Sequence, residues 1–120
     1  MPVVTIHALP PDEPAKIELT LQRVVSDLSS ALQSVPGNVW ANFTPMAAVR
    51  EGDAPDGRRD YHLVVTVRAN PRPQAQVDRG LEAVAKAVSA GLGVPLERVW
   101  VHWMPLEGGR VFANGAVSPP

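Results

Sequence analysis

The chain contains an internal duplication, and the first sign of it is the spacing of the prolines. Two stretches of equal length, residues 15–35 and 74–94, contain no proline, although the 120 residues include 13. Because proline disrupts helix interiors, each stretch can hold one long helix. Six apolar positions of the first stretch, at helical spacing, recur 60 residues later, which predicts two copies of one structural unit. The matched pairs are Ile17 and Val77, Leu21 and Leu81, Val24 and Val84, Val25 and Ala85, Leu28 and Val88, and Leu32 and Leu92.

The repeat extends into segments rich in β-branched residues on either side of each predicted helix. Residues 3–6 match residues 64–67 at an offset of 61, and residues 39–40 match residues 99–100 at an offset of 60. We therefore predict strands at 2–8, 39–44, 62–69 and 98–104, and helices at 15–33 and 74–91. A crossover helix makes the two strands that it connects parallel, so each unit is a β-α-β unit.

Two such units side by side predict an α+β fold, in which a four-stranded sheet carries both helices on one face. We expect a single domain over residues 1–120, with repeats at about 2–49 and 61–115 and a polar linker at 52–59. The face without helices then carries Val4, Ile6, Val65 and Val67 or their alternating neighbours. An apolar face of that size is typical of an interface, so the strands alone predict an oligomer.

Composition argues against several classes of function. Lys and Arg number 11 and Asp and Glu 12, and the net charge of −1 argues against nucleic acid or an anionic membrane as a partner. The chain has no cysteine and only three, widely spaced histidines, so we predict no metal site and no cofactor. The N-terminal segment lacks the basic and apolar regions of a signal peptide, which makes the cytoplasm the expected location.

Pro2 is the first candidate for chemistry. A small residue at position 2 permits removal of Met1, after which proline carries a secondary amine at the chain terminus. An α-amino group titrates near ~7.7 to 8.0, and removal from water favours its neutral, basic form. The start of a core strand would hold this amine rigidly, as a general base requires. The alternative is that proline is simply a common second residue.

The duplicated unit that begins with Pro2 resembles the tautomerase superfamily. In the second unit, the resemblance to 4-oxalocrotonate tautomerase covers residues 64–67, Arg72, residues 92–96, residues 99–103 and a Gly-x-x-Phe-x-x-Gly tail that includes Phe112. Residues 98–105 (RVWVHWMP) also resemble the corresponding segment of the cis-3-chloroacrylic acid dehalogenase family, which has the same fused two-unit chain. The resemblance covers nearly the whole chain and implies a homotrimer with a tautomerase-like barrel.

The resemblance implies roles for three residues. Pro2 matches the amino-terminal proline that acts as general base on a proton α to a carbonyl. Arg72 matches the arginine that binds the substrate carboxylate, although an arginine between two prolines can also be a solvated turn residue. Phe112 matches the aromatic wall of the pocket, and its alternative role is to cover a neighbouring subunit.

Several positions depart from the family pattern. Asp12 stands in the first unit where the second has Arg72, and the second unit begins at His62-Leu63 inside the chain, without a free amine. We therefore expect one amine site in each chain. Trp100, like Trp40, stands where a second arginine would bind a diacid. It is a candidate for contact with substrate, and strand packing is its alternative role. Arg110, or else Arg68, could supply the missing charge.

Water-activating groups also differ from those of the dehalogenase pattern. His102 occupies the position of a tyrosine, and Asn114 lies near that of a glutamate. Asparagine cannot act as a general base, so hydration and hydrolytic dehalogenation are disfavoured unless Glu107 takes that role. His102 could donate a proton or a hydrogen bond to the substrate carbonyl, or it could be a structural residue of the strand.

The resemblance, together with these residues, implies a keto-enol tautomerase that acts on a small 2-keto or 2-hydroxy-enoic acid. Pro2, Arg72 and His102 are the candidate catalytic residues, and Arg72, Phe112, Arg110 and Trp100 are the candidate binding residues. The first alternative is a cofactor-free dehalogenase, hydratase or decarboxylase that acts on a small unsaturated acid. The second is a catalytically silent trimeric binding protein.

Overall fold

A computed structural model describes residues 2–52 and 61–120. Its main elements are β1 (Val3–Ala8), α1 (Ala15–Ala31), β2 (Trp40–Pro45), β3 (Leu63–Ala69), α2 (Gln74–Leu92) and β4 (Val99–Pro105). Each predicted strand and helix is present, with its ends within two residues of the predicted positions. One-turn 3-10 helices at Pro36–Asn38 and Leu96–Arg98 precede β2 and β4, and a hairpin of β5 (Phe112–Ala113) and β6 (Ala116–Val117) follows β4. Met1 and most of the predicted linker, from residue 53 on, lie outside the described residues.

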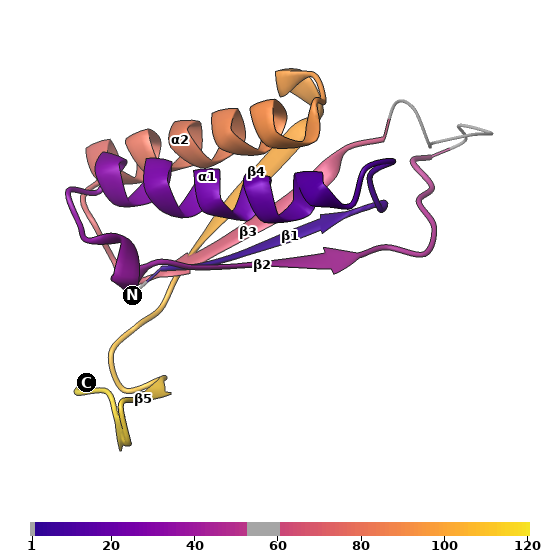
Figure 1. The fold of residues 1–120 in the computed structure, drawn as a ribbon. Helices are drawn as coiled ribbons and strands as arrows, with labels where there is room; N and C mark the ends of the chain where they lie inside the picture. The colour runs from indigo at the N-terminus through magenta and orange to yellow at the C-terminus, as the bar shows by residue number, and fades with distance from the viewer. Residues whose placement is uncertain (1, 53–60) are drawn as a thin grey trace.

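The four long strands form one mixed sheet in the order β2-β1-β3-β4. Each β-α-β unit contributes a parallel pair, β1 with β2 and β3 with β4, as a crossover helix requires. The two units meet through β1 and β3, which are antiparallel, with Thr5 opposite Thr66. Both helices cover the same face of this sheet (Figure 1). The predicted α+β architecture is therefore confirmed.

The core lies between this face and the helices. Buried strand residues on the helix side alternate with half-buried or exposed ones, as expected for a sheet with one buried face. Val4, Ile6, Val65 and Val67 all point to the helices and are fully buried. The helices contribute the buried side chains at matched positions of the repeat, Val24, Leu28, Val84, Val88 and Leu92. The duplicated apolar pattern thus becomes one shared core.

The two helices are in close contact at Gly91. A Cβ atom at this position would overlap the Thr20 side chain and lie 2.9 Å from the Thr20 Cα atom. Thr20 is fully buried, and its hydroxyl donates a hydrogen bond to the Lys16 carbonyl. The contact is made by backbone and a fixed side chain, so it has little room to relax.

Gly91→Ala is expected to destabilise the fold by about 1–3 kcal/mol, as overpacked cores usually do. At an exposed helix position the same change would stabilise by up to about 1 kcal/mol, because alanine favours helix more than glycine does. Urea unfolding measures the difference, with the exposed neighbour Ala90→Gly as a matched control for helix propensity. A Gly91→Ala protein as stable as the parent would contradict the tight contact.

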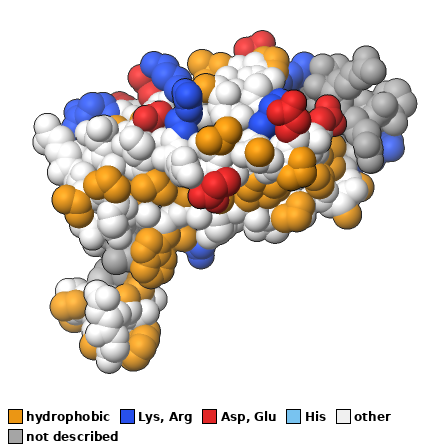
Figure 2. Space-filling view, in the orientation of Figure 1, with side chains coloured by type: hydrophobic (Ala, Val, Ile, Leu, Met, Phe, Trp, Pro, Cys, Tyr) orange, Lys and Arg blue, Asp and Glu red, His pale blue; other side chains and the backbone are white. Residues whose placement is uncertain are grey.

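The face of the sheet away from the helices is open. The sequence left two possibilities for this face: the set that includes Val4 and Val65, or the residues that alternate with it. The structure has the second set there. Four large apolar side chains are exposed on it: Trp40 (54%), Trp100 (53%), Met104 (42%) and Val64 (37%). Figure 2 shows Lys, Arg, Asp and Glu side chains gathered over the helices, and hydrophobic ones along the sheet side below them. The open face thus has the composition of an interface.

The tail after β4 leaves the body of the chain (Figure 1). Asn114 and Gly115 have positive φ angles of 54° and 79° and form the turn between β5 and β6. Phe112 and Val117 are 71% and 65% exposed on this hairpin. The tail therefore presents apolar side chains that its own chain does not cover.

In the described part of the chain, neither helix combines the length and apolar character needed to cross a membrane.

Candidate active site

The sheet topology brings the start of β1 and the end of β3 to one edge. Val3 lies opposite Arg68 in the antiparallel pair, so Pro2 continues toward Ala69 and the turn that contains Arg72. Pro2 and Arg72 are 70 residues apart in sequence, and the fold places them at the same end of the sheet. The two residues predicted to be catalytic base and carboxylate anchor therefore share an edge.

Pro2 is fixed at this edge by burial and by its backbone. Its side chain is fully buried and continues the helix-facing set of β1, two residues before Val4. Its carbonyl oxygen accepts a hydrogen bond of 3.0 Å from the Trp40 amide at the start of β2. An apolar setting of this kind favours the neutral form of an amine, which is the form that accepts a proton.

Arg72 presents donors that the described residues do not use. It lies between Pro71 and Pro73 just before α2, and its Nη1 atom donates a hydrogen bond of 3.2 Å to Oε1 of Gln76. Its Nε atom is buried and has no hydrogen-bond partner among residues 2–52 and 61–120. Because an unpaired buried donor costs about 1–3 kcal/mol, a bound acceptor would stabilise this arrangement. A carboxylate fits best, because it can accept two hydrogen bonds from a guanidinium.

Trp103 forms part of the layer beneath α2 near this edge. Its indole packs against Gly80, where an added Cβ atom would lie 2.7 Å from the ring. Its Nε1 atom is a second buried donor without a hydrogen-bond partner in the described chain. From the sequence, this tryptophan is predicted only as part of a strand.

The end of β4 and the tail form a hollow beside the turn. The Leu106 amide donates a hydrogen bond of 2.7 Å to the Ala69 carbonyl, so the chain leaves β4 next to the end of β3. A pocket of about 350 Å³ lies here, and its lining includes Asn70, Pro71, Glu107 and Asn114. Glu107, the alternative general base, is therefore near the Arg72 turn.

The remaining predicted site residues lie elsewhere within one chain. His102 and Trp100 are on the open face of β4, with ring centroids 5.8 Å apart. Trp100 pairs with Val64, at the opposite end of the sheet from Pro2. Phe112 is on the hairpin, and Arg110 is an exposed residue between β4 and that hairpin. Within the described chain, none of these four residues lines the hollow beside Pro71, although Val111 and Ala113, the neighbours of Phe112, do.

Gln76 is a residue that sequence reasoning missed. The signal was present, because Arg72 and Gln76 are four residues apart at the start of a predicted helix and can therefore meet on one face. Its hydrogen bond occupies Nη1 of the guanidinium, while the buried Nε of Arg72 has no partner among the described residues. Gln76 thus fixes the direction in which Arg72 offers its donors.

Solved structures of similar fold cover nearly the whole chain. The wild-type F6 fused 4-OT, described as an asymmetric trimer, has a TM-score of 0.86 at 12% identity over 96% of this chain and 94% of that chain. The wild-type Q0 fused 4-OT, a symmetric trimer, has a TM-score of 0.82 at 18% identity over 97% of this chain and 94% of that chain. N1, a member of the cis-3-chloroacrylic acid dehalogenase family, has a TM-score of 0.72 at 18% identity over 98% of this chain and 83% of that chain.

No protein-family model and no curated protein matches the sequence. The structural neighbours are members of the tautomerase superfamily, so the resemblance seen in the residues is confirmed at the level of the fold. The chain has the fused, duplicated β-α-β fold of these proteins.

Proposed function

We propose that this chain is a keto-enol tautomerase of the tautomerase superfamily that acts on a small 2-keto or 2-hydroxy-enoic acid. The observation that carries the proposal is the pairing at one edge of the sheet. There, the buried Pro2 lies at the same end as Arg72, whose Nε donor is buried and has no partner among the described residues. The shared fold supports membership of the superfamily, and Pro2 and Arg72 support the proposed reaction.

The proposed reaction needs one base and one anion-binding group. With Met1 removed, the Pro2 nitrogen takes a proton from the carbon next to the carbonyl, and the bond electrons move onto the carbonyl oxygen. Arg72 binds the neighbouring carboxylate and stabilises the negative charge that develops in the enolate. The proton held on Pro2 then passes to the enolate oxygen, which gives the enol. The reverse sequence converts an enol into a ketone.

Ketonisation of phenylenolpyruvate, followed by absorbance, tests this reaction. Arg72→Ala is expected to lower kcat/KM by about 10²- to 10³-fold, the usual loss when one charge-stabilising group is removed. Arg23→Ala, which removes an exposed arginine of α1, is the matched control and should retain parental kinetics. The intact mass shows whether Met1 is absent. Equal rates for the parent and Arg72→Ala would remove Arg72 from the site.

Hydration or dehalogenation is the second candidate reaction, and the position of Glu107 favours it. Glu107 lines the hollow beside Pro71, where a carboxylate could take a proton from water that attacks an unsaturated acid. Halide release from 3-chloroacrylates, lost in Glu107→Gln and retained in the parent, would identify this reaction. A catalytically silent binding protein would show neither activity and would still bind a small carboxylate.

We propose that the chain assembles as a homotrimer through the open face and the tail. The exposed Trp40, Trp100 and Met104 on that face support an interface, and the projecting hairpin offers Phe112 to a neighbour. The fused 4-OT structures of similar fold are described as trimers. Sedimentation velocity is expected to give one species with three times the chain mass. Val64→Glu, which places a charge on the open face, is expected to give monomers, and a monomeric parent at micromolar concentration would contradict the proposal.

A further inference from the structure

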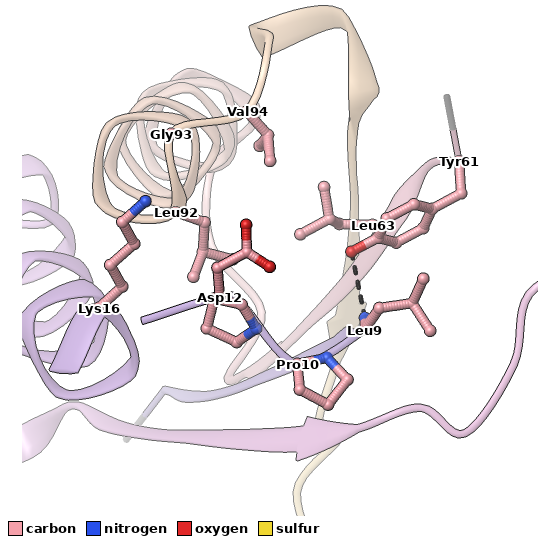
Figure 3. Close-up of a pocket in the computed structure, with 10 residues that line it drawn as sticks. Leu9, Pro10, Asp12, Lys16, Tyr61, Leu63, Leu92, Gly93 and Val94 are labelled. Carbon is pink, nitrogen blue, oxygen red and sulfur yellow. Dashed lines mark hydrogen bonds between the residues drawn. The ribbon is translucent and has the colours of Figure 1, made fainter. Parts of the chain in front are cut away.

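A second pocket lies at the end of the sheet opposite Pro2. It is about 450 Å³ in volume and is formed where β1 ends, β3 begins and α2 stops (Figure 3). The duplication makes it the counterpart of the Pro2 edge. Leu63 occupies the position of Pro2 at an offset of 61, and Pro10 occupies that of Pro71. The antiparallel pairing of β1 and β3 places the two edges at opposite ends of one sheet.

This pocket lacks counterparts of the amine and the arginine that the proposed reaction needs. Leu63 lies within the chain and has no free amine, and Asp12 stands where the second unit has Arg72. Apolar side chains of Leu9, Leu63, Leu92 and Val94 line the pocket instead. Its volume falls in the range of ~300 to 1,000 Å³ that is usual for small-molecule sites.

Two opposite charges face the pocket. Asp12 and Lys16 both line it, and Figure 3 shows their side chains on the same side, with the Asp12 carboxylate between Lys16 and Leu63. No ion pair joins these two side chains in the structure of residues 2–52 and 61–120. The Lys16 ammonium lies close to the end of α2, 3.9 Å from where a Cβ atom on Gly93 would stand. The pocket therefore offers one anion and one cation that do not neutralise each other directly.

Tyr61 adds a hydrogen-bond donor on the other side of the pocket. Its hydroxyl oxygen accepts a hydrogen bond of 3.1 Å from the Leu9 amide, so the hydroxyl proton remains able to donate. Burial raises the pKa of the Tyr61 hydroxyl, which keeps that proton in place at neutral pH. Tyr61 and Lys16 together can bind a carboxylate, while Asp12 can bind an ammonium.

From this arrangement we infer that the pocket binds a free α-amino acid with a short aliphatic side chain. The ligand's ammonium pairs with Asp12, and its carboxylate accepts hydrogen bonds from Lys16 and the Tyr61 hydroxyl. Its side chain packs against Leu63 and Val94. A ligand with only one of these charges leaves the opposite charge of the pocket without a partner. The site is separate from the Pro2 edge, so the inference does not depend on the proposed function.

L-leucine, titrated into the assembled protein and followed by calorimetry and by amide chemical shifts, tests the inference. Shifts are expected at residues around Asp12, Tyr61 and Gly93. The single-charge analogues 4-methylpentanoate and 3-methylbutylamine should bind at least tenfold more weakly, which corresponds to about 1.4 kcal/mol. Binding of the amine alone with equal affinity would overturn the amino-acid assignment.

Variants separate this pocket from the Pro2 edge. Asp12→Asn and Lys16→Gln should each raise the Kd for L-leucine by at least tenfold, and Tyr61→Phe should raise it less because the ring remains. Asp27→Asn in α1 and Lys86→Gln in α2, which alter exposed residues, are the matched controls. Arg72→Ala should leave the Kd unchanged. Binding lost in Arg72→Ala, or retained in both Asp12→Asn and Lys16→Gln, would overturn the inference, whatever the catalytic activity proves to be.

Discussion

A form of the protein with one extra residue between Met1 and Pro2 is expected to lose about 10²- to 10⁴-fold in kcat/KM for ketonisation, the usual contribution of a general base. An inserted glutamate prevents removal of Met1 and turns the Pro2 nitrogen into an amide, which cannot accept the proton. The proline ring can keep its buried place, and its carbonyl can still accept the Trp40 hydrogen bond. The change therefore removes the base and preserves the strand.

Two controls make this result specific to the amine. Pro2→Ala keeps a small second residue and a free terminus, so it should lose less activity than the extended form. The unfolding midpoint and sedimentation of the extended form should match those of the parent. An extended protein that turns over the substrate at the parental rate would show that Pro2 is not the base.

Leu28→Ala is expected to lower the free energy of unfolding by about 2.7–5.0 kcal/mol, the range measured for buried leucines in a well-packed core. Leu28 is fully buried in α1, and its Cδ1 atom lies 3.3 Å from where a Cβ atom on Gly80 of α2 would stand. Its removal leaves a cavity between both helices and the sheet, and few neighbours there can move to fill it.

Leu19→Ala on the same helix is the matched control. Leu19 is 59% exposed, so the same substitution should change the free energy of unfolding by about 0.5 kcal/mol or less. Urea unfolding must compare the proteins at one concentration, because the stability of an oligomer depends on it. Equal losses for the two variants would place Leu28 outside the core.

The fold could be predicted because its signals repeat. Helical spacing, the proline-free stretches and the alternating strands each occur twice, so one copy supports the interpretation of the other. The sequence left open which face of the strands the helices cover. Packing decides it: Ile6 and Val65 are buried under the helices, while His102 and Trp100 face away from them. Strand alternation alone is compatible with both choices.

The candidate site could be predicted only in part. Pro2 and Arg72 were identified from chain position and resemblance, but their common edge follows from the antiparallel pairing of β1 and β3. The role of Gln76 depends on the direction of the Arg72 side chain, which neither composition nor spacing determines. The places of Phe112, Arg110, His102 and Trp100 in the site stay predictions.

Because β1 and β3 are antiparallel, the corresponding edges of the two β-α-β units lie at opposite ends of the sheet. If the two β-α-β units were separate, identical subunits, every substitution would appear at both ends of the shared sheet at once. Fusion removes that equivalence, because each residue of the joined chain lies at one end only. A change at Leu63 or Asp12 leaves Pro2 and Arg72 as they are. Joining two copies thus allows one end to preserve an inherited chemistry while the other acquires a new ligand.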